Sequence, residues 1–210
     1  MEKALLSFDL DGTLVKPDLV NRFWFEEVPR LFAKNHDLDF DEAVVFVKNR
    51  YEEVGSEDIR WYKPEYWFDR FGIDEKPSSI VEGIFHEVSY YQDALDLLEK
   101  VSDEHELIVT SNAHRIFLDV QLRDIRDYFS RIFSSVSDMG SVKKDPRVYE
   151  KVCEKVGVEP KDMVHIGDNK VFDYESPREL GIRTFLVDRN GGMESSEYVV
   201  KDLRKILEKI

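Results

Sequence analysis

The sequence predicts an α/β protein in which a parallel β-sheet is interrupted once by a helical insert. Short apolar segments recur along the 210-residue chain, and each of them ends at polar or small residues. Between most of these segments, apolar residues are spaced as on one face of an α-helix. Strands that alternate with helices favour right-handed crossovers and therefore a parallel sheet. One aromatic-rich region breaks the alternation, because it has helical spacing and no clear strand.

Four segments have the length and apolar character of buried strands. They are residues 4–8, 107–110, 163–166 and 184–187. The apolar spacing predicts helices over residues 93–101, 116–125 and 146–156. Gly157 and Gly181 follow helical patterns at positions where a left-handed residue would end the helix. Asp202 is placed to cap a last helix over residues 203–207, after a short edge strand over residues 198–200.

Residues 18–88 form the aromatic-rich exception, and we predict that they are a helical cap domain. Residues 14–18, which contain Pro17, and residues 89–92 would form the two connections between this insert and the sheet. Residues 1–17 and 89–210 would then make up the α/β core domain. The aromatic residues of the insert include Phe23, Trp24, Phe25, Phe32, Trp61, Tyr62, Tyr66, Trp67 and Phe68.

The overall charge restricts the partners that the protein can bind. With 30 Lys and Arg against 44 Asp and Glu, the formal net charge is −14. Nucleic acids and anionic membranes are bound mainly through Lys and Arg, so we predict neither as a partner. A small phosphorylated substrate is compatible with this charge, because a metal ion and a few cationic groups can gather at one site. No sequence pattern specifies an oligomeric state.

Cysteine usage and hydropathy favour the cytoplasm. Cys153 is the single cysteine, so no internal disulfide can form. No stretch approaches the ~20 apolar residues that span a membrane, and the N-terminus lacks a basic region followed by a cleavage site. We therefore expect an unprocessed cytoplasmic protein.

Polar residues follow the first two predicted strands. The segment FDLDGTL places Asp9 and Asp11 two positions apart, before a glycine turn. In a continuing strand these two residues share a face, so both carboxylates could meet one metal ion or one substrate group. The segment ELIVTSN ends in Ser111 and Asn112, and a hydroxyl and an amide at a helix N-terminus suit a phosphate oxygen. Taken alone, the first segment is equally compatible with a solvated turn, and for the second an ordinary helix cap is the commoner explanation.

Two further polar segments lie later in the chain. Lys143 and Lys144 stand just ahead of an Asp-Pro pair that begins a predicted helix. The segment GDNKVFD follows the strand over residues 163–166 and offers Asp168 and Asp173 beside a glycine turn. A lysine pair alone is usually solvated, and a single acid at such a turn is common.

The four segments carry more weight together than separately. The carboxyl ends of parallel strands lie along one edge of the sheet, where ligands bind at the point at which the strand order reverses. The strand ends at Asp9, Ser111 and Asp168 would therefore converge. Carboxylates, a hydroxyl and a lysine around one pocket are the groups that hydrolysis of a phosphate monoester requires.

In order and spacing, these four segments resemble the four motifs of the haloacid dehalogenase (HAD) superfamily. The resemblance spans the whole predicted sheet domain, and FDLDGTL is highly specific for that superfamily. It implies a Rossmann-like α/β core with an inserted α-helical cap of the C1 type. It also implies a phosphatase that hydrolyses a small phosphorylated metabolite through an aspartyl-phosphate intermediate.

The resemblance gives a role to each matching residue. It makes Asp9 the nucleophile, and it makes Asp11 the acid that protonates the leaving oxygen and then activates water. Thr13 would support the turn of the first motif and is predicted, like Lys143, to help bind the substrate. Ser111 and Asn112 would hold phosphoryl oxygens. The implied cofactor is Mg2+, held by the Asp9 carboxylate, the Asp11 backbone carbonyl, Asp168 and, directly or through water, Asp173.

Two positions depart from the pattern of the superfamily. The third motif requires a lysine that neutralises charge on the nucleophile and the phosphoryl group. Alignment on the Asp-Pro pair selects Lys143, but Lys144 then stands where proline is usual, so both lysines remain candidates. Phe172 stands where asparagine is common, which changes the expected hydrogen bonding around Asp173.

The same fold also supports functions other than that of a phosphatase. A haloacid dehalogenase lacks the second acid of the first motif, so the presence of Asp11 favours phosphoryl chemistry. A phosphomutase uses the same four motifs and is the alternative enzyme. A non-catalytic binding or regulatory protein would have lost Asp9 or Asp11, and both are present. The cap residues that select a substrate follow no transferable motif.

The histidines and the candidate residues of the insert are not predicted to belong to the catalytic site. The five histidines show no metal-ligand spacing, and His114, close to the second motif, is a candidate for lining the pocket. Within the insert, Arg50, Trp61, Tyr62 and Lys63 are candidates for contact with substrate, although an aromatic stripe is more often the core of its own domain.

Overall fold

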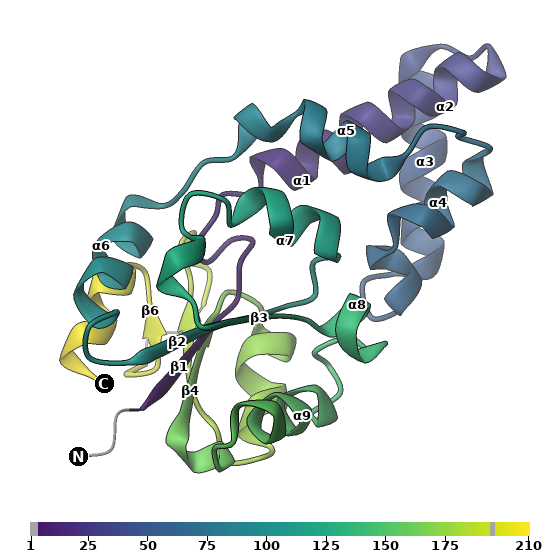
Figure 1. The fold of residues 1–210 in the computed structure, drawn as a ribbon. Helices are drawn as coiled ribbons and strands as arrows, with labels where there is room; N and C mark the ends of the chain where they lie inside the picture. The colour runs from purple at the N-terminus through teal and green to yellow at the C-terminus, as the bar shows by residue number, and fades with distance from the viewer. Residues whose placement is uncertain (1–3, 194–195) are drawn as a thin grey trace.

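The computed structural model describes residues 4–193 and 196–210 and contains a six-stranded sheet flanked by helices (Figure 1). All the strand pairs are parallel, and the strand order is β3-β2-β1-β4-β5-β6. The predicted α/β fold with a parallel, Rossmann-like sheet is therefore confirmed. The strands are β1 (Leu5–Phe8), β2 (Glu106–Ser111), β3 (Arg131–Ser134), β4 (Met163–Gly167), β5 (Arg183–Val187) and β6 (Val199–Val200).

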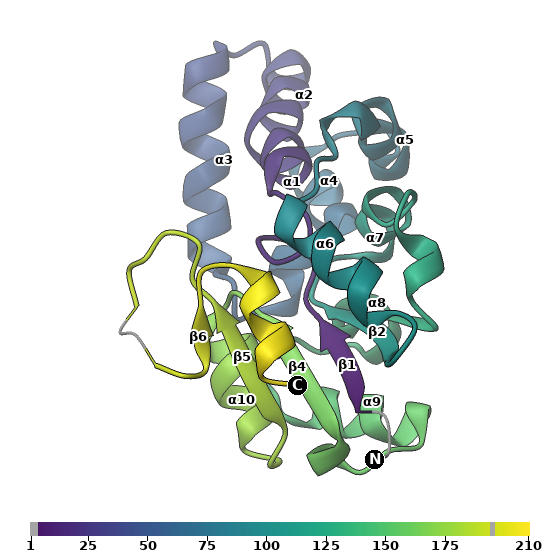
Figure 2. The same cartoon turned by 90° about the vertical axis from the view of Figure 1, so that its left-hand side faces the viewer.

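Helices cover both faces of the sheet, and a group of helices projects beyond it (Figures 1 and 2). The projecting group comprises α1 (Asp18–Arg22), the π-helical turn η1 (Phe23–Glu27), α2 (Val28–His36), α3 (Phe40–Val54), η2 (Ile59–Tyr62), α4 (Pro64–Phe71), α5 (Pro77–Gly83) and η3 (Phe85–Glu87). Those packed on the sheet are α6 (Gln92–Val101), α7 (Arg115–Gln121), η4 (Arg126–Tyr128), α8 (Ser135–Met139), α9 (Arg147–Val156), η5 (Pro160–Asp162), the π-helical turn η6 (Lys170–Glu175), α10 (Ser176–Arg178) and η7 (Leu203–Glu208).

Strand β1 lies at the point where the strand order reverses. From β1 the chain builds outward to β2 and β3 on one side and to β4 and β5 on the other. Leu6 pairs in register with Leu107 on one side and with Val164 on the other, and all four residues of β1 are buried. Because β1 is central, the residues that follow its carboxyl end lie at the crevice between the two halves of the sheet.

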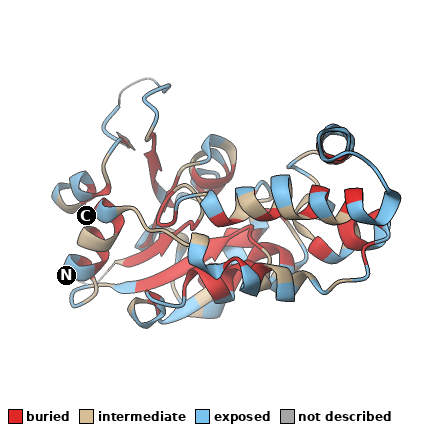
Figure 3. Ribbon diagram, turned by 90° about the horizontal axis from the view of Figure 1, so that it is seen from above, coloured by how far each residue is buried: buried red, intermediate tan, exposed pale blue. Residues whose placement is uncertain are grey.

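The helical insert is joined to the sheet by two connections that run side by side. The Lys16 amide donates to the Ser89 carbonyl at 2.8 Å, and Val15 and Tyr90 form an isolated antiparallel bridge. Residues 18–88, all of them described, form no strand. Figure 3 shows buried residues along the strands and on the inner sides of the insert helices, with exposed residues on their outer sides. The division into core residues 1–17 and 89–210 and cap residues 18–88 stays a prediction.

Most expected elements agree with the structure, and three features differ from the prediction. Gly157 and Gly181 both adopt the left-handed conformation, with φ of 80°, and Asp202 caps the last helix by accepting from the Arg204 amide. The helix predicted over residues 116–125 ends at Gln121, and the last helix is of the 3-10 type. Strand β3 was not predicted, because it is a four-residue edge strand whose first residue is exposed and polar.

Candidate active site

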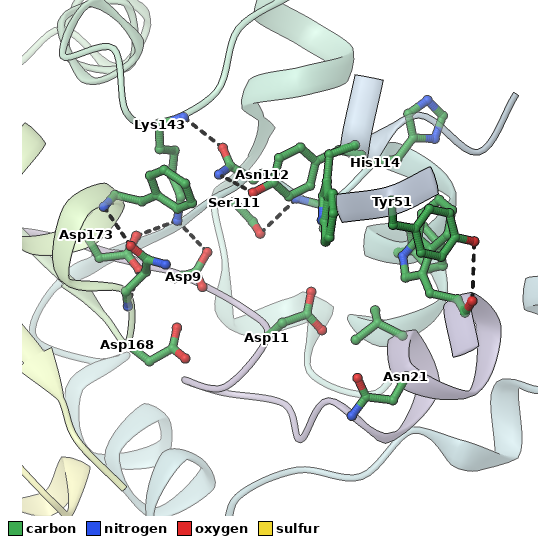
Figure 4. Close-up of a pocket in the computed structure, with 18 of the residues that line it drawn as sticks. Asp9, Asp11, Asn21, Tyr51, Ser111, Asn112, His114, Lys143, Asp168 and Asp173 are labelled. Carbon is green, nitrogen blue, oxygen red and sulfur yellow. Dashed lines mark hydrogen bonds and ion pairs between the residues drawn. The ribbon is translucent and has the colours of Figure 1, made fainter. Parts of the chain in front are cut away.

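A cavity of about 310 Å³ lies where the carboxyl ends of the central strands meet the helical insert (Figure 4). Such a volume is at the small end of the range for small-molecule sites, ~300–1,000 Å³. Both the sheet and the insert contribute side chains. The lining residues are Asp9, Asp11, Val20, Asn21, Trp24, Phe25, Tyr51, Trp61, Tyr62, Ser111, Asn112, Ala113, His114, Phe117, Lys143, Asp168, Asn169, Phe172 and Asp173.

Lys143 joins two carboxylates at the bottom of this cavity. Its Nζ lies 2.5 Å from Asp9 Oδ1 and 2.5 Å from Asp173 Oδ1, and it donates to the Thr110 carbonyl at 3.2 Å. Burial alone would lower the pKa of Lys143, but the charges of Asp173 and Asp9 raise it above the ordinary value. The ammonium group is therefore charged although the residue is only 1% exposed. Lys144, in contrast, is exposed and pairs with Glu57 at 2.5 Å.

Asp173 is held by a network that extends behind the cavity. Its Oδ1 also lies 3.1 Å from His165 Nε2, while its Oδ2 accepts from the Asn169 amide at 2.9 Å. His165 Nδ1 is 2.9 Å from Ser7 Oγ in the neighbouring strand. Burial would raise the pKa of Asp173, but Lys143 and His165 lower it well below the ordinary value. Asp173 is therefore ionised and fixed in orientation.

Sequence reasoning did not place His165 in this network. One feature of the sequence does point to it: His165 is the one polar residue of β4, which otherwise consists of apolar residues and glycine. Ser7 stands at the matching register in β1, and both residues are fully buried. Two buried polar residues side by side on central strands indicate a polar network behind the strand ends, because such groups need hydrogen-bond partners.

Three carboxylates are close enough to share one cation. Ligand oxygens of Asp9, Asp168 and Asp173 all lie within 4.8 Å of one another. Burial and the neighbouring charge of Asp9 raise the pKa of Asp168 to about 8. A divalent cation with a preference for oxygen ligands, such as Mg2+, would balance the negative charge of these three neighbouring carboxylates. The donor set therefore fits a magnesium site.

Two glycines allow these carboxylates to approach the backbone. A Cβ atom added at Gly12, whose φ is +80°, would lie 2.3 Å from Asp168 Oδ2. A Cβ atom added at Gly167 would lie 2.3 Å from Asp173 Cγ. Only glycine fits at either position without moving a carboxylate, which explains the glycine in each acidic motif.

Asp11 lies in the same cavity but has a separate partner. Its Oδ1 accepts a hydrogen bond of 2.6 Å from Gln121 Nε2. Burial raises the pKa of Asp11 to about 7, so it can gain or lose a proton near neutral pH. Gln121 ends α7 and is fully buried, and its Oε1 has no partner among residues 4–193 and 196–210. No local sequence pattern predicts this contact.

The predicted phosphate-binding residues divide into two groups. Ser111 and Asn112 line the cavity, and Asn112 Oδ1 is fixed by the Lys143 amide at 2.8 Å and the Ser135 hydroxyl at 2.6 Å. Thr13 does not line it. Its carbonyl accepts from Arg189 Nη2 at 2.7 Å behind the turn, and its hydroxyl is buried without a partner in the described part of the chain.

The insert brings Tyr62 to the same place. Tyr62 Oη lies 3.5 Å from Asn112 Nδ2 and donates to the Ser56 carbonyl at 3.0 Å. Trp61 and His114 also line the cavity, whereas Arg50 and Lys63 do not. The cavity is thus formed by both parts of the chain.

The match with a family model agrees with this geometry. The family described as haloacid dehalogenase-like hydrolase matches residues 6–187 of the chain. The chain belongs to the haloacid dehalogenase-like hydrolase family. The superfamily and the hydrolase class predicted from the four motifs are therefore confirmed.

Named relatives within this family include phosphatases. The GMP/IMP nucleotidase YrfG of Escherichia coli is 26% identical over 195 residues, which cover 90% of this chain and 86% of the relative. The glyceraldehyde 3-phosphate phosphatase of Pyrococcus furiosus is 23% identical over 226 aligned residues, which cover 97% of this chain and 91% of the relative.

Solved structures share the same fold. A HAD phosphatase from Thermococcus onnurineus superimposes with a TM-score of 0.86 at 24% identity, covering 99% of this chain and 96% of that one. A HAD family enzyme from Bacteroides thetaiotaomicron, solved with magnesium and inorganic phosphate, gives a TM-score of 0.63 at 20% identity, covering 92% of this chain and 98% of that one.

Among the helices of the described residues, none has both the length and the apolar character that a membrane span requires.

Proposed function

We propose that this HAD-like hydrolase is a Mg2+-dependent phosphatase that acts on a small phosphorylated metabolite. The observation that carries the proposal is the joint placement of Asp9, Lys143 and Asp168 at one end of the cavity, with Asp11 beside them. Asp9 is a nucleophile next to a cation, and Asp11 is a separate acid with a pKa near neutrality. The relatives named as a nucleotidase and a phosphatase support the same chemistry.

The reaction takes two steps. Asp9 attacks phosphorus and the bond from phosphorus to the leaving oxygen breaks, while Asp11 gives that oxygen its proton. Asp11 then removes a proton from a water molecule, which attacks the aspartyl-phosphate, so that inorganic phosphate leaves and Asp9 is restored. Splitting one difficult displacement into two is the advantage of covalent catalysis. A pKa of about 7 allows Asp11 to serve first as acid and then as base.

Fixed charges and dipoles stabilise the transferred group in this proposal. Lys143, rather than Lys144, balances the negative charge that accumulates on Asp9 and the phosphoryl oxygens, because only Lys143 reaches the cavity. Ser111 and the Asn112 amide bind phosphoryl oxygens. Bound Mg2+ supplies positive charge for the phosphoryl oxygens and for Asp9.

The same proposal gives each remaining carboxylate a role. Asp9, the Asp11 carbonyl and Asp168 bind Mg2+ directly. Asp173, whose oxygens already have protein partners, acts through water and orients Lys143. Thr13 supports the turn from behind. We also propose that residues 18–88 act as a cap over the core residues 1–17 and 89–210, excluding water from the site, and that the enzyme works in the cytoplasm.

Phosphate release tests the proposed function. The assay compares hydrolysis of p-nitrophenyl phosphate by the whole chain with Mg2+ and with excess EDTA. We expect turnover that requires the metal and that returns when Mg2+ is restored. A folded protein that binds Mg2+ but releases no phosphate from this substrate or from a panel of phosphometabolites would contradict the proposal.

The hydrogen bond from Gln121 is expected to position Asp11 for proton transfer. In Gln121→Leu, kcat/KM for alkyl phosphates should fall by about 10- to 100-fold, since general acid catalysis contributes about 10²- to 10⁴-fold. For p-nitrophenyl phosphate the loss should be much smaller, because nitrophenolate leaves without protonation. Steady-state assays of both substrate types measure the difference.

Gln92 provides a matched control for this variant. Its Nε2 also donates to an aspartate, Asp96 Oδ1, at 2.9 Å, but on the outer side of α6. Gln92→Leu should leave both substrates unaffected. An equal loss on both substrates in Gln121→Leu would mean that Gln121 has only a structural role.

Affinity for Mg2+ is expected to increase with pH. Asp168 has a pKa of about 8 in the metal-free protein, so below pH 8 it carries a proton that the cation must displace. The apparent Kd should therefore weaken by about tenfold for each pH unit as the pH falls from 8 to 6. Isothermal titration with MgCl2 at pH 6, 7 and 8 measures this slope. In Asp168→Asn, affinity should be lower at every pH and the slope flatter; equal affinity of the unaltered protein at pH 6 and 8 would rule out Asp168 as a ligand.

A further inference from the structure

The cavity has two chemically different ends. In Figure 4, Asp9, Asp168, Asp173 and Lys143 gather at one end, whereas Tyr51 and Asn21 lie at the other. Cavity-lining rings from the insert and from α7 pack around Tyr51, either directly or through Trp24. We name them the aromatic chamber: Trp24, Phe25, Tyr51, Trp61 and Phe117.

The rings of the aromatic chamber support one another. Trp24 meets Tyr51 edge-on, with ring centroids 5.6 Å apart, and Tyr51 meets Trp61 in the same manner at 5.9 Å. Phe117 of α7 lies 5.8 Å from Trp24, so a helix on the sheet contributes to the same wall. Edge-to-face pairs at these distances are favourable, so the chamber is formed before any ligand arrives.

The backbone of η1 is shaped so that two neighbouring rings reach the cavity. Trp24 and Phe25 lie in this π-helical turn, and both line the cavity although they are adjacent in sequence. Turns of this type are rare and are found frequently at functional sites. Trp24 is partly exposed and Phe25 is 36% exposed, so their rings remain accessible.

The position of Asp11 indicates which part of the substrate lies in the aromatic chamber. Asp11 lies between the two ends in Figure 4, and in the proposed reaction it protonates the leaving oxygen. With phosphate at the charged end, the rest of the substrate must extend past Asp11 toward the rings. A short polyol there would lose water from its hydroxyls, and the apolar rings could not replace those hydrogen bonds. A flat ring would instead bury apolar surface against them.

We propose, resting on the phosphatase function above, that the substrate's leaving group carries a flat aromatic ring that packs in the aromatic chamber, as the base of a nucleoside 5′-monophosphate does. The two relatives named above do not decide this point, since one name includes a nucleotide and the other a three-carbon phosphate. The exposed amide of Asn21, at the same end of the cavity, offers a donor and an acceptor to the polar edge of such a ring.

A pair of substrates isolates the contribution of the ring. GMP and ribose 5-phosphate carry the same phosphate on the same primary carbon, and they differ by the base. We expect kcat/KM to be about 10- to 100-fold higher for GMP, the range given by stacking of one base on aromatic side chains. p-Nitrophenyl phosphate, assayed in parallel with Mg2+, reports whether phosphoryl chemistry occurs at all.

Two phenylalanines of the insert give a matched pair of variants. Phe25 and Phe40 are 36% and 40% exposed, and each lies beneath a cation, Lys48 at 5.5 Å and Arg30 at 5.9 Å from the respective ring centroids. Only Phe25 lines the cavity. Phe25→Leu should lower the preference for GMP over ribose 5-phosphate by about threefold or more. Phe40→Leu should leave it unchanged.

The outcomes separate the two proposals. A preference for GMP that falls in Phe25→Leu alone supports the aromatic chamber as the site for the leaving group. Turnover of p-nitrophenyl phosphate with no preference for GMP, or with an equal change in both variants, overturns this inference and leaves the phosphatase in place. If the folded, Mg2+-loaded protein hydrolyses neither these three substrates nor the wider panel of phosphometabolites, the proposed function is overturned, and the inference with it.

Discussion

Replacing Asp9 by asparagine is expected to reduce kcat for phosphate release by about 10⁴-fold or more, as removal of a catalytic nucleophile does in other enzymes. Asparagine keeps the size of the side chain but is a far weaker nucleophile than a carboxylate. Lys143 retains its contact with Asp173 in this variant, so we expect the fold to survive. Assays of phosphate release with saturating Mg2+, together with circular dichroism, measure both effects.

Trapping the intermediate makes the test of Asp9 more specific. After acid quenching during turnover, the unaltered protein should carry the mass of one phosphoryl group on the peptide that contains residues 5–16, and Asp9→Asn should carry none. Asp11→Asn provides the control, since it retains the nucleophile and loses the proton donor. It should still accept phosphate from p-nitrophenyl phosphate but turn over slowly. A folded Asp9→Asn enzyme with more than a tenth of normal kcat would exclude the covalent route.

Replacing Lys143 by methionine is expected to impair both stability and activity. The change removes the cation between Asp9 and Asp173 and leaves two buried carboxylates facing one another. Removing one partner of a buried ion pair typically costs about 3–5 kcal/mol. For a chain of this size, that corresponds to a fall in Tm of about 6–20 °C. Turnover should be lost even at temperatures where the variant remains folded.

The neighbouring lysine supplies the control for this variant. Lys144→Met removes a solvent-exposed pair with Glu57, which contributes at most about 1 kcal/mol. The double variant Lys143→Met/Asp173→Asn removes a positive and a negative charge together and should regain much of the lost stability without regaining activity. Differential scanning calorimetry of the three variants compares these effects. Equal destabilisation by the two lysine substitutions would contradict the buried-network interpretation.

Local sequence patterns predicted much of the sheet. Five of the six strands were predicted: four from continuous apolar runs, which buried parallel strands require, and β6 as a short edge strand. Strand β3 escaped prediction since it lies at the edge of the sheet and is short. The acidic motifs were recognisable for a similar reason: each follows a strand, and the glycines beside them permit an approach that a Cβ atom would block.

Contacts between distant residues could not be predicted in this way. The Gln121 side chain meets Asp11 across 110 positions in the sequence, and nothing around Gln121 distinguishes it from a helix-terminal residue. His165 is visible only as a polar residue in an apolar strand. His165 can hold Asp173 only because η6 places Asp173 Oδ1 3.1 Å from His165 Nε2. Packing, rather than local pattern, brings these pairs together.

The sequence by itself determined the family, the sheet and the acidic residues at the strand ends, because these depend on short-range periodicity and on motifs of a few residues. Only the tertiary structure decided that Lys143 enters the cavity while Lys144 turns to the insert, since adjacent side chains in a turn differ in direction and not in composition. It also assembled the aromatic chamber from η1, α3, η2 and α7, because the rings become neighbours only when the insert packs against α7.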